Sequence, residues 1–184
     1  MIYIKEAKNK NPQLMDIPIE QLKEGLLKNI LWLDQAFGRV YKIQRNVGGK
    51  RYTEPCIYCG DERYETLIPS EELGNYSFFV LHDPTEVTED FVRANVSIIF
   101  WVDLRQCYGN DDVRCTENVK SDIVKALVQD IWVRGASFTV KRVYEEGKKV
   151  FEGFTIDEND AQMLMQPYAA FRVDGVLNQI LQTC

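Results

Sequence analysis

Apolar residues recur every three or four positions between residues 19 and 37, which predicts an amphipathic helix. The stripe consists of Ile19, Leu22, Leu26, Ile30, Leu33 and Phe37. Pro18 suits the first helical position, and Gly38 suits a C-terminal end. Leu27 and Leu31 widen the stripe, so we expect this helix to be well buried.

A β-hairpin is predicted over residues 39–60. A strand-like stretch, 40–45, leads into the tandem glycines Gly48 and Gly49, which tolerate the positive φ values of tight turns. The return strand is expected near 51–53. Pro55 is expected to interrupt it before a further β-forming stretch at 56–59.

The strongest strand signal lies at residues 93–104, whose middle is apolar on both faces, as in a central strand. A second helix is predicted over 117–133, with Thr116 as N-cap and Gly135 at its end. Weaker signals predict a strand at 2–6, a polar connection at 60–90 with one strand at 76–82, a hairpin of 138–144 with 149–151 around Glu146 and Gly147, a short helix from Asp157 to before Pro167, and a last strand at 168–176.

Together these elements predict an α+β fold. We expect a mostly antiparallel sheet with a hairpin arm, packed by two main helices. Residues 1–18 are interpreted as an N-terminal extension and residues 19–184 as a single domain, which suits a chain of 184 residues. No stretch has the pattern of a signal peptide or a membrane span.

Composition excludes several function classes. The formal charge is −6 with a single histidine, His82, so one chain cannot build a multi-histidine metal site. An acidic chain also argues against specific nucleic-acid binding held by phosphate contacts. The charge is divided unevenly: residues 1–55 hold ten Lys and Arg against six Asp and Glu, and the acidic excess lies in 56–184.

The stretch 39–51 contains no acid and concentrates the basic residues on the predicted hairpin. We interpret it as a candidate interaction surface formed by Arg39, Lys42, Arg45, Lys50 and Arg51. Two readings stay open: a solvated basic face, or an arm that meets an acidic surface on a neighbouring copy or another protein.

Five cysteines without a secretion signal suggest reduced thiols. Cys56 and Cys59 form a C-x-x-C motif, but on a strand positions i and i+3 point to opposite faces, so the two sulfurs would not bind one metal. Cys107 and Cys115 could complete a four-cysteine site, or form a disulfide with each other, only if their segments meet. We therefore expect no metal and no cofactor.

Catalytic motifs are absent from the sequence. There is no G-x-S-x-G, phosphate-binding loop or dinucleotide-binding fingerprint, and His82 at a predicted strand end has no evident nucleophile beside it. The expectation is a protein that is not an enzyme.

The order of elements resembles the tail terminator, tail-completion and head-tail joining proteins of long-tailed bacteriophages. The resemblance rests on three features: an opening helix that runs into Arg39-Val40-Tyr41, a Pro-led strand at 55–58, and a strong strand at 97–103 followed by a helix. It covers about residues 19–176 as a pattern. The N-terminal 18 residues and the long acidic loop 60–90 depart from it.

This resemblance implies a non-enzymatic structural protein of a phage or prophage. Such proteins assemble as a hexameric ring on the tail tube and face the head connector, so the implied location is the virion tail, and the host cytoplasm during assembly. Reversing the charges of Arg45 and Arg51 to Glu is then expected to abolish assembly. The alternatives are a protein-binding adaptor of a mobile element or cell, and a thiol- or zinc-dependent protein centred on Cys56 and Cys59.

Overall fold

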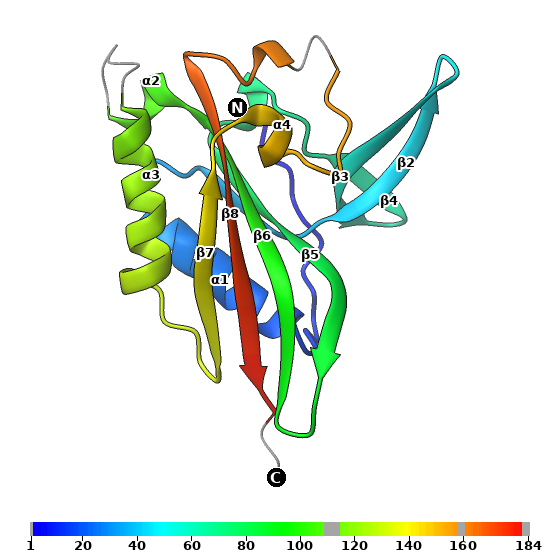
Figure 1. Cartoon of the computed structure of the whole chain (residues 1–184). Helices are drawn as coiled ribbons and strands as arrows, with labels where there is room; N and C mark the ends of the chain where they lie inside the picture. Colours follow the sequence, from blue (N-terminus) through cyan, green and yellow to red (C-terminus); the bar gives the residue numbers. More distant parts are fainter. Residues whose placement is uncertain (1, 109–114, 158–160, 182–184) are drawn as a thin grey trace.

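The computed structural model describes residues 2–108, 115–157 and 161–181, and it confirms the α+β fold with a mostly antiparallel sheet, a hairpin arm and two main helices (Figure 1). Two sheets are present. One has five strands in the order β1-β5-β6-β8-β7, and the other has three in the order β2-β3-β4. The strands are β1 (Gln35–Arg39), β2 (Tyr41–Val47), β3 (Lys50–Gly60), β4 (Arg63–Thr66), β5 (Tyr76–Val87), β6 (Phe91–Asp103), β7 (Ala136–Tyr144) and β8 (Tyr168–Ile180).

The helices are α1 (Asp16–Asn29), α2 (Leu104–Cys107), α3 (Thr116–Lys125) and α4 (Gly147–Val150), with short helical turns η1 (Glu71–Leu73) and η2 (Ala126–Asp130). No helix among the described residues is long and apolar enough to cross a membrane.

Strand β6 is the centre of the five-stranded sheet, as its apolar run predicts. It pairs antiparallel with β5 on one side and with β8 along all thirteen of its residues on the other. Alternate residues enter two different cores. Ile98 and Phe100 face α1 and α3, and Ile99 and Trp101 face the opposite side. Burial on both faces explains why this strand is apolar throughout its middle.

Helices α1 and α3 cover one face of the large sheet; in Figure 1, α1 passes behind the strands and α3 lies at their left. On the other face, the base of β3, helix α4 and the segment after it cover only the half nearest the arm. The remaining half of that face is covered by no other element of the described chain, and polar side chains of β5, β6, β7 and β8 line it. We call it the open sheet face.

The predicted hairpin is confirmed, with Gly48 and Gly49 at φ 57° and 80° in the turn. β4 adds a third strand to it, and we call residues 41–66 the arm. It projects from the body at the upper right of Figure 1. The predicted interruption at Pro55 is wrong: β3 runs unbroken from Lys50 to Gly60. Pro55 pairs in register with Lys42, and its carbonyl accepts the N–H of Leu67, so the strand continues through the proline.

The predicted first helix is too long at its C-terminal end. α1 stops at Asn29, and residues 35–39 form the edge strand β1, which pairs parallel with β5. Phe37 therefore lies in the core on the sheet's other face rather than in the helical stripe. Leu31, counted as part of that stripe, is 96% exposed. Pairing with a strand forty residues away has replaced the local helical pattern.

Three further expectations are wrong. Residues 2–6 join no sheet; they form a strap whose Glu6 carboxylate accepts the N–H of Gly38 at 3.0 Å. Residues 138–144 pair with β8, not with 149–151, because 147–150 form helix α4. The connection at 60–90 holds β4 as well as a longer β5. The last strand is confirmed and extends to Ile180, whereas most of the first turn of the helix predicted from Asp157 lies outside the described residues.

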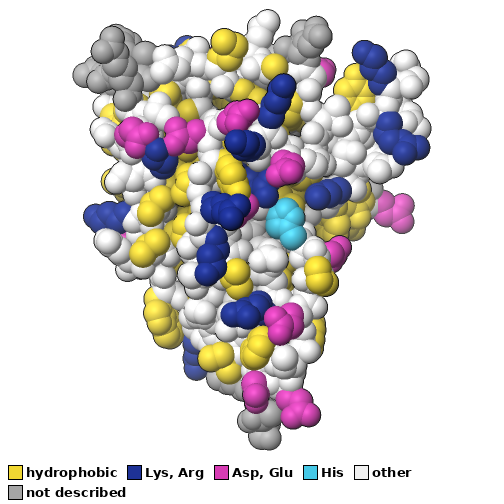
Figure 2. Space-filling view, viewed as in Figure 1, with side chains coloured by type: hydrophobic (Ala, Val, Ile, Leu, Met, Phe, Trp, Pro, Cys, Tyr) yellow, Lys and Arg dark blue, Asp and Glu magenta, His cyan; other side chains and the backbone are white. Residues whose placement is uncertain are grey.

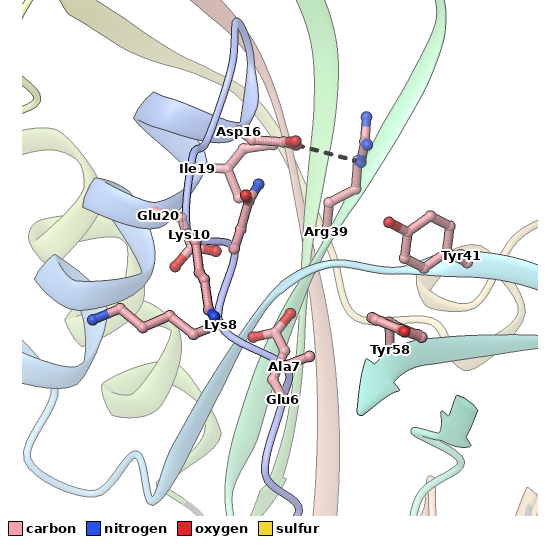
Figure 3. A pocket seen from close by; sticks show the side chains of 11 residues that line it. Glu6, Ala7, Lys8, Lys10, Asp16, Ile19, Glu20, Arg39, Tyr41 and Tyr58 are labelled. Carbon is pink, nitrogen blue, oxygen red and sulfur yellow. Dashed lines mark ion pairs between the residues drawn. The ribbon is translucent and has the colours of Figure 1, made fainter. Parts of the chain in front are cut away.

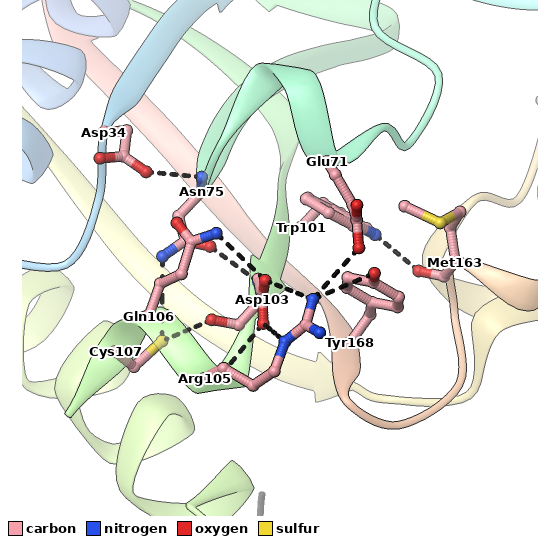
Figure 4. Close-up of polar contacts among 10 residues, drawn as sticks. All are labelled: Asp34, Glu71, Asn75, Trp101, Asp103, Arg105, Gln106, Cys107, Met163 and Tyr168. Carbon is pink, nitrogen blue, oxygen red and sulfur yellow. Dashed lines mark hydrogen bonds and ion pairs between the residues drawn. The ribbon is translucent and has the colours of Figure 1, made fainter. Parts of the chain in front are cut away.

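A polar network closes the upper end of β6 (Figure 4). Asp103, the last residue of β6, accepts hydrogen bonds from Arg105 and Gln106, and its own N–H donates to Asn75 Oδ1 at 2.7 Å. Trp101 Nε1 donates to the carbonyl of Met163 at 2.6 Å. These bonds tie α2, the η1–β5 loop and the segment before β8 to the central strand.

Candidate interaction surface

The five basic residues proposed from the sequence lie at different distances along the arm and are not equally free. Arg39, at the end of β1, pairs with Asp16 at 3.5 Å (Figure 3). Lys42, at the arm's base, lies 5.6 Å from the centroid of the Phe154 ring. These two cations are therefore engaged with the body of the protein.

Arg45 lies further out and is also engaged. Its Nε is 3.3 Å from Glu54 Oε2, and its Nη2 donates to the carbonyl of Tyr64 at 3.4 Å. Lys50 and Arg51 begin β3 at the tip, where both are exposed and neither has an ion pair within the described part of the chain. Among the five proposed residues, the positive charge without an ion pair is thus concentrated at the tip.

The pairing register divides the cations between the two faces of the arm. Val47 pairs with Lys50 and Arg45 with Tyr52, so Lys50 and Arg45 lie on one face. Asn46 pairs with Arg51, which places Arg51 on the other face with Lys42. The five residues therefore do not form one continuous patch.

Three tyrosines form a cluster on the face that carries Arg45. Tyr41 comes from β2, Tyr58 from β3 and Tyr64 from β4. The ring centroid of Tyr64 lies 5.7 Å from that of Tyr41 and 5.3 Å from that of Tyr58. All three are exposed, at 43%, 36% and 39% respectively. We call Tyr41, Tyr58, Tyr64 and Arg45 the tyrosine face.

A pocket of about 350 Å³ adjoins the tyrosine face where the arm meets the body (Figure 3). Tyr41 and Tyr58 form its arm side, and Ile19 of α1 lies at its other side. The segment that follows the strap supplies Lys8 and Lys10. The pocket thus continues the aromatic surface into a recess that carries both basic and acidic side chains.

Sequence reasoning identified the basic residues but missed the tyrosines. The three residues are far apart in sequence and meet only because the β2–β3–β4 register places Tyr58 opposite Tyr64 and Tyr41 beside them. Tyr41 and Tyr58 lay on stretches predicted to be β, but Tyr64 lay in the predicted polar connection, so no local signal joined the three. Tyr and Arg are the residue types most enriched at the centres of protein interfaces.

The cysteines do not form a metal site among the described residues, where no group of three or more potential ligands converges. Cys56 and Cys59 both lie on β3, as predicted, and burial raises the pKa of each thiol. The Sγ of Cys107 donates to the carbonyl of Asp103, and the Sγ of Cys115 donates to that of Leu104. Both of these side chains are thiols, not halves of a disulfide.

His82 has a serine neighbour that sequence reasoning did not identify. Its Nε2 lies 2.6 Å from Ser97 Oγ, which donates to Asp174 Oδ1 at 2.6 Å. The carboxylate thus contacts the serine, whereas in a nucleophile–base–acid triad it orients the histidine. Ser97 is also only 1% exposed.

No protein-family model matches the chain, and no curated protein matches it either.

Proposed function

We propose that this chain is a non-enzymatic assembly protein of a phage or prophage tail, of the terminator or tail-completion kind, that associates head to tail with further copies of itself. The single observation that carries the proposal is the exposed tyrosine face on a projecting arm. A cluster of three exposed tyrosines with an arginine has the composition of an interface centre. Of the features that resemble tail terminator proteins, the opening helix and the strong strand at 97–103 followed by a helix support the tail as its place.

A head-to-tail ring requires two different surfaces on each subunit. The arm supplies one of them. The other must carry negative charge to attract the tip cations Lys50 and Arg51. The end of β5 and the turn into β6, together called the acidic turn, fit, because Asp83, Glu86, Glu89 and Asp90 are all exposed there. Only Glu86 has an ion pair among the described residues, a long one of 3.9 Å to Arg93.

The arm and the acidic turn lie at different ends of the molecule (Figure 1). The turn is at the lower end of the sheet and the arm is beside its upper end. The arm of one subunit therefore cannot reach the acidic turn of the same subunit. Each surface is free to bind a neighbouring copy. We commit to this pairing of arm and turn between neighbouring copies.

A charge-reversal pair tests the proposal. Lys50→Glu with Arg51→Glu reverses the arm tip without breaking an internal ion pair, and Glu89→Lys with Asp90→Lys reverses the turn. Each variant alone is expected to lose assembly, because like charges then face one another. A mixture of the two variants is expected to regain it, since each reversed arm meets a reversed turn in an alternating ring. Lys28→Glu with Lys125→Glu, on the helical layer, is the control.

Assembly is measured by native mass spectrometry at low salt, and electron microscopy of concentrated protein is expected to show rings of one diameter. Tyr64→Ala, which removes the centre of the tyrosine cluster, is expected to weaken association by about ten-fold or more. Two results would contradict the proposal: a monomer at every concentration, also in the presence of tail tubes, or assembly that none of these variants changes.

A further inference from the structure

The open sheet face contains a depression of about 470 Å³ lined by side chains of four adjacent strands. β5 supplies His82, β6 supplies Asn95, β8 supplies Arg172 and β7 supplies Lys141 and Arg142. In Figure 2 the single histidine of the chain is visible near the middle of this face, with dark-blue basic side chains gathered beside it. None of the residues of the tyrosine face lines this depression.

A β-bulge aims two consecutive cations into this depression. The register of β7 against β8 shifts between Val140, which pairs with Gly175, and Arg142, which pairs with Asp174. Val140 and Val143 both pack into the core beneath the sheet, so the two residues between them lie on the open face. Without the bulge, strict alternation would send one of Lys141 and Arg142 to the other face.

The acids of this region are already occupied by their own neighbours. Asp174 receives Arg172 Nε at 2.6 Å and Arg172 Nη2 at 3.1 Å, as well as the hydroxyl of Ser97. Glu152 receives Arg172 Nη1 at 3.1 Å. No ion pair joins Lys141 or Arg142 to an acid within the described ranges. Arg142 hydrogen-bonds the phenol of Tyr144 rather than an acid, so both bulge residues keep their positive charges for a ligand.

We propose that this depression is a binding site for a phosphate group. Arg142 presents a planar fork of donors that matches phosphate oxygens, and Lys141 adds a second charge against a dianion. Asn95 and His82 offer neutral polar atoms on the opposite wall. The network of buried Arg172 and Ser97 with half-buried Asp174 forms the floor and joins the strands that carry these groups. The phosphate can belong to a free phosphate or to a phosphodiester chain, since both present the same oxygens.

The experiment titrates the full-length chain with inorganic phosphate at constant ionic strength and follows the imidazole resonances of His82 by NMR. These signals need no assignment, because the chain has one histidine. Saturable shifts are expected. Calorimetry gives the affinity, which the double variant Lys141→Gln with Arg142→Gln is expected to lower by about ten-fold or more. Arg142→Lys, which keeps the charge and loses the fork, is expected to have an intermediate effect.

A matched control, Lys28→Gln with Lys125→Gln, removes two exposed charges from the helical layer and is expected to leave the affinity within about two-fold. An oligothymidylate as a second probe separates the two sources: tighter and steeply salt-dependent binding indicates a phosphodiester chain, and equal or weaker binding indicates free phosphate. The proposal is overturned if no probe produces saturable shifts, or if the bulge variant and the control lose affinity equally. Circular dichroism verifies that each variant is folded.

Discussion

The carboxylate of Asp103 is held on both of its oxygens by Arg105, two residues further along the chain. Arg105 Nε donates to Oδ1 at 2.9 Å, Nη2 donates to Oδ2 at 2.8 Å, and the backbone N–H of Arg105 donates to Oδ1 at 3.0 Å. Burial of Asp103 by itself raises its pKa, but these hydrogen bonds prevail and hold the pKa below its ordinary value. One side chain thus ends the central strand and caps helix α2.

The first prediction is that Asp103→Asn lowers the free energy of unfolding by about 2 kcal/mol, because the charge-assisted bonds are lost. Since the folded pKa is depressed, this stabilisation is present above the ordinary pKa of Asp and disappears as the pH falls through the folded value. Urea unfolding at several pH values should show the gap between wild type and variant closing in acid. A gap that is constant with pH would contradict this role.

The second prediction concerns the arm. Gly49 has φ 80°, which a β-branched residue adopts only with strain. Gly49→Val is expected to cost about 1–2 kcal/mol and to loosen the arm alone. Hydrogen exchange should accelerate at the amides of β2 and β3 and stay unchanged in β6. Gly49→Asn, a residue that tolerates positive φ, serves as the control and should exchange like the wild type.

The third prediction concerns Gly175 in β8, which pairs with Val140 next to the bulge in β7. A Cβ there would lie 2.8 Å from the backbone oxygen of Thr139 and would overlap the ring of Phe138. Gly175→Ala is expected to destabilise the protein by about 1–3 kcal/mol, because a backbone atom cannot rotate away as a side chain can. Thermal unfolding measures the loss. An unchanged melting temperature would show that β7 and β8 separate easily at this point.

The fourth prediction concerns thiol reactivity. Burial, with smaller contributions from nearby acidic groups, raises the pKa of Cys107 to about 12, so almost no thiolate is present at pH 8. Alkylation by iodoacetamide, followed by peptide mass spectrometry, should label Cys107 at least about ten-fold more slowly than glutathione in the same tube. Labelling as fast as glutathione would show that the site opens or that the thiolate is stabilised.

The fifth prediction concerns His82. Burial lowers its pKa, and so do the charges of Arg172 and Lys42, while Asp174 and Glu152 act in the opposite direction. Because the folded pKa is below the unfolded one, this residue costs stability as the pH falls through about 6.5. His82→Gln is expected to flatten that part of the stability curve. NMR titration should place the midpoint below 6.5, and a midpoint above it would contradict the prediction.

Local patterns predicted those parts of the fold that depend on neighbouring residues. The apolar run of β6, the stripe of α3 and the Gly48–Gly49 turn are such cases. The edge strand β1 was missed, because Phe37 fits a helical stripe equally well and only pairing with β5 decides against it. Helix α4 was missed for the same reason. Residues 138–144 and 149–151 were predicted to form one hairpin, but β7 pairs with the distant strand β8 instead.

For the candidate sites too, features set by local sequence were predictable and features set by pairing between distant segments were not. Charge could be read along the chain, so Lys50 and Arg51 were visible as a basic pair on a hairpin. The tyrosine face depends on the register of three strands, and the cationic depression depends on one bulge at Lys141. Neither register nor bulge leaves a periodic mark in the sequence, because each follows from contacts between distant segments.

The junction between β1 and β2 determines how the arm transmits force. Only Val40 separates the two strands, and its N–H donates to the carbonyl of Phe79 in β5. No flexible linker therefore separates the arm from β1. A force applied to the tip of the arm acts directly on the parallel β1–β5 pair at the edge of the sheet. The β1–β5 pair is short and irregular in register. We therefore expect these two strands to separate first under tension. If the arm of each copy binds the acidic turn of the next, the mechanical limit of the assembly lies inside each subunit, at the β1–β5 pair.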